Sequence, residues 1–208
     1  MARPKNPLIS RDGAVRAALE EIDADGLDAF NLGRVAKRLG VAAPSLYHHF
    51  RDKNEILTEV ARLILAEAEE PARLPADDWR EALITLAISA RRSILRHPKA
   101  APLLLMFPPR HVALKAYERS LRIFEKKGVP KELHMPIVNG MDSIVFGAAL
   151  LTASTRAQEI DAFPIFDPAG FPSLTGAIKA NTLDEEEIFV RVARSFLEGI
   201  YPSALDKA

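Results

Sequence analysis

The sequence predicts an all-α protein with an N-terminal three-helix unit and a larger helical domain behind it. Apolar residues recur at helical spacing along almost the whole chain, whereas the alternating pattern of strands is nearly absent. Residues that begin or end helices, such as Ser10, Asn31 and Gly40, flank the periodic segments. Both observations favour the same fold class.

The first helix is expected to begin after Ser10 and to end near Gly26. Its apolar residues fall on one stripe: Ala14, Val15, Ala18, Leu19 and Ile22. Residues 1–9 contain two prolines and are expected to form a disordered arm.

Residues 31–53 read NLGRVAKRLGVAAPSLYHHFRDK, which predicts two short helices joined by a tight turn. Asn31 can cap the first, because its side chain accepts a free backbone N–H one turn ahead. Gly40 ends that helix, since glycine enters the left-handed conformation there without a steric penalty. Pro44 lies where the second helix begins, and the missing N–H of proline costs nothing at that position.

The second short helix, residues 43–50, is expected to have one apolar and one polar face. Leu46 and Phe50 would face inward, four residues apart. The residues left to face outward are Ser45, Tyr47, His48 and His49. This arrangement is a helix-turn-helix, whose second helix enters the major groove of DNA.

The remaining helices follow from caps and periodicity. Asp52, with Glu55 three residues later, predicts a capping box that opens a helix to about residue 70. Thr182 and Glu185 predict a second capping box before the last helix. Between them we expect a proline-containing linker and five further segments: linker 70–78, helix 79–96, a Leu-rich piece 102–107, helix 111–127, helix 136–155 and a long loop 161–173.

These elements predict a three-part organisation. Residues 1–53 would form the helix-turn-helix domain, including the arm 1–9. Residues 54–70 would be a connecting helix, and residues 71–208 a ligand-binding and dimerisation domain.

Composition limits the function. The chain has 28 basic and 28 acidic residues, so its overall charge does not indicate nucleic acid. Residues 31–53 nevertheless hold five cations and one acid, which is typical of a small DNA-binding module. Cysteine is absent, and neither a signal peptide nor a run of about 18 apolar residues is evident. We therefore expect a cytoplasmic protein with no membrane partner, no metal and no cofactor.

The DNA contacts divide into two kinds, those to phosphate and those to base edges. The phosphate candidates are Tyr47, His49 and Lys53, the last at a helix start that favours an anion. The base-edge candidates are Arg34, Ala43, Pro44, Ser45 and His48. The alternative for His48 and His49 is a pair of solvated helix residues.

The segment VAKRLGVAAPSLYHHFRDKNEIL resembles the DNA-binding signature of the TetR family of bacterial repressors. The resemblance covers roughly residues 10–65, and Trp79 and the turn 95–97 look like the tetracycline-repressor branch. It implies a ligand-responsive repressor that binds a palindromic operator, with Tyr47 and Lys53 on the DNA backbone. Gly33 departs from the pattern, because such repressors often carry a DNA-contacting side chain there.

Binding of a palindrome implies a homodimer. Small residues recur at seven-residue spacing on the apolar helix 136–155, and bulky residues would come from the last helix. The predicted interface is Gly140, Gly147, Ser154, Phe189, Phe196 and Ile200. The alternative is that these stripes pack inside one protomer.

A mostly apolar pocket is expected in the second domain. Its candidate residues are Leu104, Met106, Phe107, Tyr117, Ser120, Leu121, Asn139, Ser143 and Phe146. Asp142 could contact a ligand, pair with Arg91 or Arg92, or form an interface ion pair. The segment after His97 reads LLLMFPP without a histidine, so we expect an apolar, metal-free effector rather than a magnesium-bound tetracycline.

The sequence disfavours two other functional classes. A helical enzyme is disfavoured, because the five histidines show no HExxH spacing and no phosphate-binding glycine loop or GxSxG motif is present. A ligand-independent DNA-binding protein is disfavoured by the size of the apolar second half.

Overall fold

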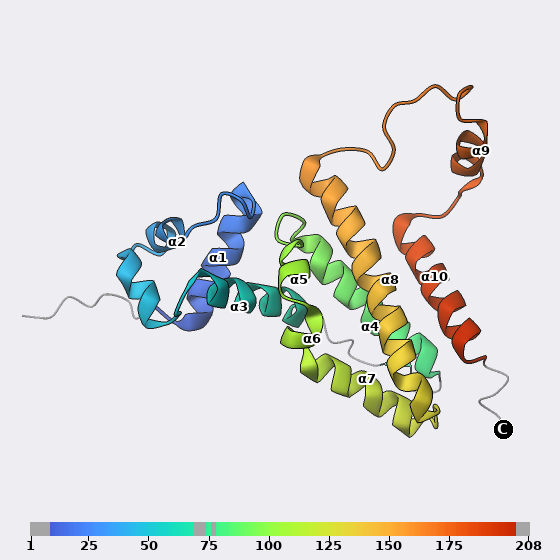
Figure 1. Ribbon diagram of the computed structural model, residues 1–208, viewed down its shortest axis with the longest axis horizontal. Coiled ribbons are helices and arrows are strands. Elements are labelled where there is room, and N and C mark those ends of the chain that lie inside the picture. Colours follow the sequence, from blue (N-terminus) through green and yellow to red (C-terminus); the bar gives the residue numbers. More distant parts are fainter. Residues whose placement is uncertain (1–8, 69–73, 76–77, 203–208) are drawn as a thin grey trace, which may run out of the picture. The chain divides into compact units, whose positions relative to one another are not determined.

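The computed structural model describes residues 9–68, 74–75 and 78–202, in which every regular element is a helix (Figure 1). The predicted all-α fold is thus confirmed for these residues. The elements are α1 (Arg11–Asp25), α2 (Leu32–Arg38), η1 (Ala43–His48), α3 (Lys53–Ala66), α4 (Trp79–Arg96), α5 (Leu103–Met106), α6 (Pro109–Val112), α7 (Leu114–Lys126), α8 (Lys131–Gln158), α9 (Pro172–Ala180) and α10 (Glu185–Ile200). The arm, apart from Ile9, and most of the linker 70–78 lie outside the described residues.

The chain forms two compact units. The first consists of Met1–Glu67 and Arg96–Leu114, and the second of Ala68–Leu95 and Lys115–Ala208. The chain therefore enters the second unit, returns to the first and leaves it again.

The first unit is built around the predicted stripe of α1, whose side chains are buried. Ser10 caps this helix by accepting the backbone N–H of Gly13 at 3.0 Å, and Gly26 follows its last residue, both as predicted. α1 contacts α2 and α3, while α3 also contacts α5 and α6. The three N-terminal helices and the segment after α4 thus share one core.

α3 begins as expected but ends earlier. The Asp52 side chain accepts the backbone N–H of Glu55 at 2.8 Å, which confirms the cap. The Glu55 carboxylate accepts the backbone N–H of Arg51 at 2.8 Å, one residue before the expected partner. The helix ends at Ala66, whereas a helix to about residue 70 was expected.

The second unit has a core formed by α4, α7, α8 and α10. Its buried members are Trp79, Leu83, Ile84, Ala87, Phe124, Val129, Ile137, Val138, Met141, Val145, Phe189, Ala193 and Leu197. α8 and α10 run side by side in opposite directions, and residues 159–171 with α9 extend away from them (Figure 1). α9 buries none of its residues.

The predicted start of the helix at Pro136 is wrong. The helix expected to open at Pro136 begins at Lys131, so that Pro136 lies inside α8. His134 anchors this first turn by contacting the carbonyl oxygen of Val129 through Nε2 at 2.9 Å. Because Pro136 lies so near the helix start, its missing N–H removes only one bond, to the exposed turn at Glu132.

The helix expected over residues 111–127 is divided into α6 and α7. Ala113, with φ −123° and ψ 33°, leaves the helical conformation between them. The chain passes from the first unit to the second immediately afterwards, between Leu114 and Lys115. The break therefore coincides with the crossing from one unit to the other.

The region before the last helix also differs from expectation. The capping box is formed by Asp184 and Glu187, two residues later than Thr182 and Glu185, and α10 begins at Glu185. α9 was not predicted and follows a long loop that largely agrees with the expected one. On α10, the apolar side chains of Ile188 and Val192 are 41% and 49% exposed.

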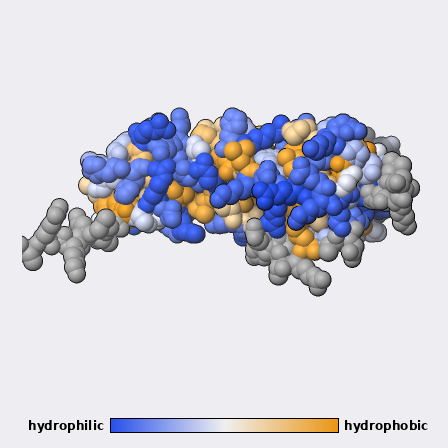
Figure 2. Space-filling view, turned by 90° about the horizontal axis from the view of Figure 1, so that it is seen from below, coloured by the Kyte–Doolittle hydropathy of each residue, from blue (hydrophilic) through white to orange (hydrophobic). Residues whose placement is uncertain are grey.

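α8 is long and apolar enough, by length and composition alone, to cross a membrane, which the sequence reading did not indicate. Only 33% of its most apolar window is buried, and a helix of a soluble protein's core satisfies the same criteria. Hydrophobic residues are also visible among hydrophilic ones on the face of the molecule shown in Figure 2. Apolar surface therefore remains uncovered in a single chain.

Candidate nucleic-acid interface and ligand region

The helix-turn-helix has the predicted geometry in its first half. The Asn31 side chain accepts the backbone N–H of Arg34 at 3.0 Å, and Gly40 has φ +68°. In this left-handed conformation a side chain would be strained, so glycine is needed to end α2. The sequence signal at this turn was therefore correct.

The second half is shorter than expected. A helix over residues 43–50 was predicted, but η1 is a 3₁₀ helix that ends at His48. Ala42 provides no side-chain cap, and the N–H groups of Ser45 and His49 bond to the carbonyls three residues earlier. Such bonds tighten short helices whose ends lack side-chain caps.

η1 presents the expected two faces. Leu46 and Phe50 are 0% and 2% exposed and belong to the core. Tyr47 is 57% exposed, and Pro44 and His48 are also exposed. The other candidates on this segment, Ala43, Ser45 and His49, are half-buried. The outward face is therefore narrower than the sequence indicated, with Tyr47 as its largest exposed side chain.

The base-edge candidate Arg34 has partners within its own unit. Its guanidinium donates to the carboxylates of Glu21 and Asp25 on α1. Arg38 also donates to Glu21, at 3.0 Å. These bonds lower the pKa of Glu21, first through the bond from Arg34, while burial opposes the shift. Much of the basic charge predicted for residues 31–53 is thus balanced by α1.

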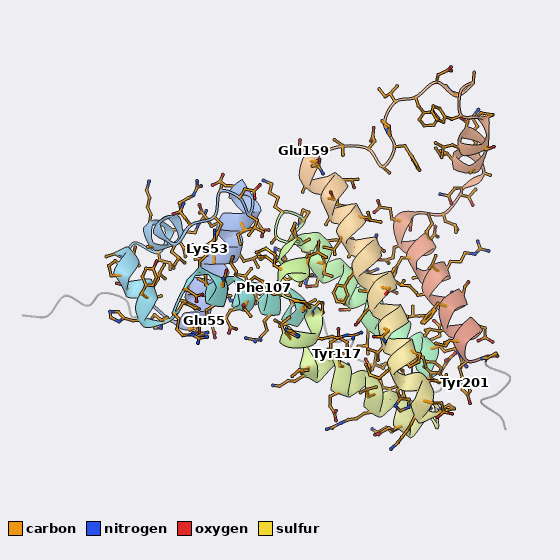
Figure 3. The ribbon with its side chains drawn as sticks, viewed as in Figure 1. Lys53, Glu55, Phe107, Tyr117, Glu159 and Tyr201 are labelled. Carbon is orange, nitrogen blue, oxygen red and sulfur yellow. The ribbon has the colours of Figure 1, made fainter. Side chains whose placement is uncertain are left out.

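Lys53 lies at the first position of α3, near Glu55 (Figure 3). Its Nζ donates to the carbonyl oxygen of Phe30 at 3.0 Å and lies 5.3 Å from the centre of the Phe30 ring. Lys53 is an exposed residue at the N-terminus of the helix, where the dipole favours an anion. Its position is compatible with a phosphate contact.

Arg11 is a structural residue that the sequence did not reveal. It donates to the His49 carbonyl oxygen and to the carboxylates of Glu55 and Glu59, the latter two at 2.8 and 3.2 Å. Its guanidinium also lies 4.6 Å from the centre of the Phe50 ring. Arg11 therefore joins α1 to α3 and to the end of residues 43–50, which we call the recognition segment. No local pattern could have indicated contacts 38 to 48 residues away.

The predicted pocket residues belong to different units. Leu104, Met106 and Phe107 lie in the first unit, and the other six lie in the second. Leu104 is 3% exposed and belongs to the core, whereas Met106 is 55% exposed. Phe107 is half-buried. The structure therefore does not bring all nine residues together within one unit.

In the second unit, Tyr117 on α7 donates through its hydroxyl to Asp142 on α8, at 3.1 Å (Figure 3). Leu121 packs against the core beside Tyr117, and Phe146 is half-buried. The hydroxyls of Ser120 and Ser143 bond to backbone carbonyls one turn earlier in their own helices. Asn139 is exposed.

The two arginines weighed as partners of Asp142 have contacts on α10. The buried Arg91 lies 3.6 Å from the Glu185 carboxylate and 5.5 Å from the centre of the Phe189 ring. Arg92 donates to Glu186 at 2.8 Å. In the parts of the chain that the structure describes, no group of three or more His, Cys, Asp or Glu side chains is placed to hold a metal ion.

The predicted interface residues occupy two kinds of environment. Phe189 is 3% exposed inside its own core, and Phe196 and Ile200 pack partly against that core. A Cβ atom at Gly140 would lie 2.0 Å from Cζ of Phe196, so these two residues pack together within the protomer. Ser154 is exposed, and Gly147 is exposed with open space beside it.

Comparisons with known proteins agree with this architecture. Residues 14–60 match the family described as bacterial regulatory proteins of the tetR family, and residues 70–202 match the tetracyclin repressor-like C-terminal domain. The tetracycline repressor protein class D of Escherichia coli is 27% identical over 92% of this chain and 88% of its own length. The transcriptional repressor DrrR1 of Streptomyces coeruleorubidus is 30% identical over 71% of this chain and 55% of its own.

Solved structures of similar proteins include the TetR family protein ActR of Streptomyces coelicolor in complex with actinorhodin. It has a TM-score of 0.75 and 25% identity, and the match covers 94% of this chain and 98% of ActR. A possible TetR family regulator from the same organism has a TM-score of 0.77, at 20% identity. The chain belongs to the TetR family of bacterial regulators and is a ligand-responsive transcriptional repressor with a helix-turn-helix domain.

Proposed function

We propose that this repressor binds a palindromic operator as a homodimer and is released by a small, mostly apolar effector. The observation that carries the operator proposal is the division of the recognition segment into two faces. Its exposed residues are Pro44, Tyr47 and His48, and its buried residues are Leu46 and Phe50. The second helix of such a motif enters the major groove. A protein of this kind would act in the cytoplasm, next to the chromosome.

On the operator, Tyr47, His49 and Lys53 would contact phosphates. Their role would be to position the protein rather than to read the sequence. The residues that we propose contact base edges are Ala43, Pro44, Ser45 and His48. Arg34 is a further candidate for such a contact. Arg34 would have to leave the Glu21 and Asp25 carboxylates to reach a guanine, so we expect it to contribute less.

The homodimer proposal rests on apolar faces that a single chain leaves uncovered. Gly147, Leu151 and Ser154 follow one another at helical spacing on α8, and all three are exposed, Leu151 by 74%. On the neighbouring α10, Ile188 and Val192 are 41% and 49% exposed. Packing these faces against those of a second copy would form a four-helix bundle.

This interface keeps Gly147 and Ser154 from the sequence prediction. We propose that Gly140, Phe189 and Phe196 stabilise the fold of the single protomer and not the dimer interface, because they pack within its own core. Small residues on the outer stripe of α8 would allow the partner helix to approach closely.

The effector would bind in the second unit, near the Tyr117–Asp142 hydrogen bond. These groups offer a polar attachment point beside the apolar Leu121 and Phe146. The complex of ActR with actinorhodin supports a small organic effector. Effector binding would lower operator affinity by favouring a state of the protein that binds DNA less well.

The testing experiment is a footprint on the DNA that flanks the protein's own gene, at two salt concentrations. We expect a two-fold symmetric protected region and an affinity that falls steeply with salt, because phosphate contacts release counterions. Apolar compounds can then be screened for release of the DNA. Binding that never exceeds the level on unrelated DNA, with a protein shown by mass spectrometry to carry no ligand, would count against the proposal.

A further inference from the structure

His97 lies between two carboxylates from different helices of the first unit. Its Nδ1 is 2.7 Å from Oδ2 of Asp23, near the end of α1, and its Nε2 is 2.9 Å from Oε2 of Glu67, which caps the end of α3. The three side chains are partly shielded, with exposures of 15% for His97, 32% for Asp23 and 26% for Glu67. Neither contact is part of the DNA-binding or ligand-binding proposals above.

The geometry requires the charged form of the imidazole. A neutral ring has one N–H and one lone pair, so it can donate to only one of two acceptors. With a carboxylate oxygen at hydrogen-bond distance from each nitrogen, only the imidazolium satisfies both. The pKa of His97 is correspondingly raised, first by the hydrogen bond to Asp23, although burial acts in the opposite direction.

The ends of two helices supply a further reason for a cation here. The C-terminus of a helix carries partial negative charge and favours basic groups, yet α1 and α3 have no basic residue in their last turns. The last residue of α4 and the segment that follows it supply these basic groups. Arg96 donates to the Glu67 carbonyl oxygen at 2.6 Å and Lys99 to the Ala24 carbonyl oxygen at 2.7 Å, on either side of His97.

Other charged groups around the cluster come from the same elements. Arg16 on α1 and Arg96 lie 3.9 and 4.0 Å from the Glu67 carboxylate. The second oxygen of Asp23, Oδ1, is buried and has no hydrogen-bond partner among the described residues. The adjacent α5 carries no charged residue. His97 is the one titratable cation of this cluster that changes charge near neutral pH.

We propose that His97 is a positioning residue for operator binding, which joins the ends of α1 and α3 through its charged ring and makes operator affinity fall as pH rises. The proposal rests on operator binding by the first unit. α3 begins at Lys53, shortly after η1, and Glu67 caps its other end, so the cluster holds the far end of the helix that follows η1. His97 itself directly follows α4, where the chain returns from the second unit.

The direction of the pH effect follows from linkage. A histidine whose pKa is raised on folding stabilises the folded form fully below its unfolded pKa of about 6.5. This stabilisation is lost as the pH rises through the higher folded pKa. When the ring loses its proton, it keeps only one N–H donor. The other nitrogen then presents a lone pair to a carboxylate and can no longer donate a hydrogen bond to it. The link between α1 and α3 would loosen.

The test measures operator affinity against pH by fluorescence anisotropy, with a labelled duplex of the DNA flanking the protein's own gene and at constant salt. We expect wild-type affinity to fall at least about fivefold through the titration, the lower end of typical coupling between sites. His97→Gln should remove that component, because glutamine remains uncharged. His111→Gln, at an exposed position, is the matched control and should keep the wild-type profile. Identical profiles for wild type and His97→Gln would overturn the proposal.

A second measurement needs neither an operator nor a folded variant. Nitrogen NMR of the wild-type protein distinguishes the imidazolium from the two neutral tautomers. We expect both nitrogens of His97 to be protonated at neutral pH, because its pKa is raised above the ordinary histidine value of about 6.5. A neutral His97 at pH 7 would overturn the proposal even if operator binding is confirmed, and a charged His97 would survive a failure to find the operator.

Discussion

The guanidinium of Arg34 on α2 donates to the carboxylate of Glu21 on α1, whose side chain is only 5% exposed. The same carboxylate accepts from Arg38 at 3.0 Å, so one buried acid holds two cations of the helix that precedes the recognition segment. The two residues lie 13 positions apart. This pairing balances part of the basic charge of residues 31–53 with acidic side chains of α1.

Glu21→Gln should destabilise the first unit, because it leaves two arginines without their shared carboxylate. We expect the free energy of unfolding to fall by about 1–2 kcal/mol, since Arg34 and Arg38 are partly exposed and water screens them. Urea denaturation provides the measurement. Glu20→Gln is the control, as Glu20 is 64% exposed and lies 3.6 Å from Arg38. An equal loss in both variants would show that burial of Glu21 has no special role.

Glu55 should make the first unit sensitive to strong acid. Its pKa is lowered to about 2, mainly by the backbone N–H of Arg51 and then by the side chain of Arg11. Since the folded pKa is depressed, the stabilisation is present above the unfolded pKa of about 4.3 and is lost as pH falls toward 2. Unfolding followed by circular dichroism from pH 6 to pH 2 should show a flatter profile for Glu55→Gln than for the wild type. An unchanged slope would refute this account.

Tyr47 and Ser45 should affect operator binding in different ways. Tyr47→Phe removes an exposed hydroxyl and should weaken binding about tenfold on every sequence, as expected for a lost bond to a charged phosphate. Ser45→Ala should instead change the preference among operator variants. Anisotropy titrations with a panel of single-base substitutions separate the two effects. If neither variant differs from wild type, the major-groove assignment is incorrect.

Alanine substitutions at Gly140 and Gly147 should have opposite effects on protomer stability, although both lie on α8. A Cβ at Gly140 would lie 2.0 Å from the Phe196 ring and must displace it, which costs about 1–3 kcal/mol. At Gly147 the space is open, so the higher helix propensity of alanine should contribute up to about 1 kcal/mol. Thermal unfolding under conditions that keep the chain monomeric tests the comparison. A stabilised Gly140→Ala would contradict it.

A bulky residue at Gly147 should dissociate the homodimer while the protomer stays folded. Gly147→Leu places a branched side chain on the face of α8 that we assign to the partner copy. Light scattering coupled to size-exclusion chromatography would then report a mass near the 22.9 kDa of one chain, with unchanged circular dichroism. Lys131→Leu, at an exposed position in the first turn of α8, is a control for added apolar surface. An intact Gly147→Leu dimer would place the interface elsewhere.

Capping residues and apolar spacing predicted most of the helices, and most of the errors were shifts of helix ends by a few residues. Ser10, Asn31 and Asp52 were correctly identified as N-caps, because a short polar side chain before an apolar stripe can satisfy free N–H groups within one turn. Thr182 carries the same signal but was the wrong choice, since Asp184 with Glu187 offers an equivalent box two residues later. Pro136 was mistaken for a helix start, because the pattern alone does not distinguish a first position from a sixth.

The sequence by itself determined the fold class, the helix-turn-helix and the buried pair Leu46 and Phe50, since caps, turn glycines and apolar spacing act over a few residues. Only the tertiary structure decided that Arg34 meets Glu21, that Arg11 meets His49, and that His97 lies between two carboxylates. These contacts join residues 13 to 74 positions apart. Such pairings depend on how whole helices pack, and helix packing is set by the combined shape of many side chains rather than by any short pattern.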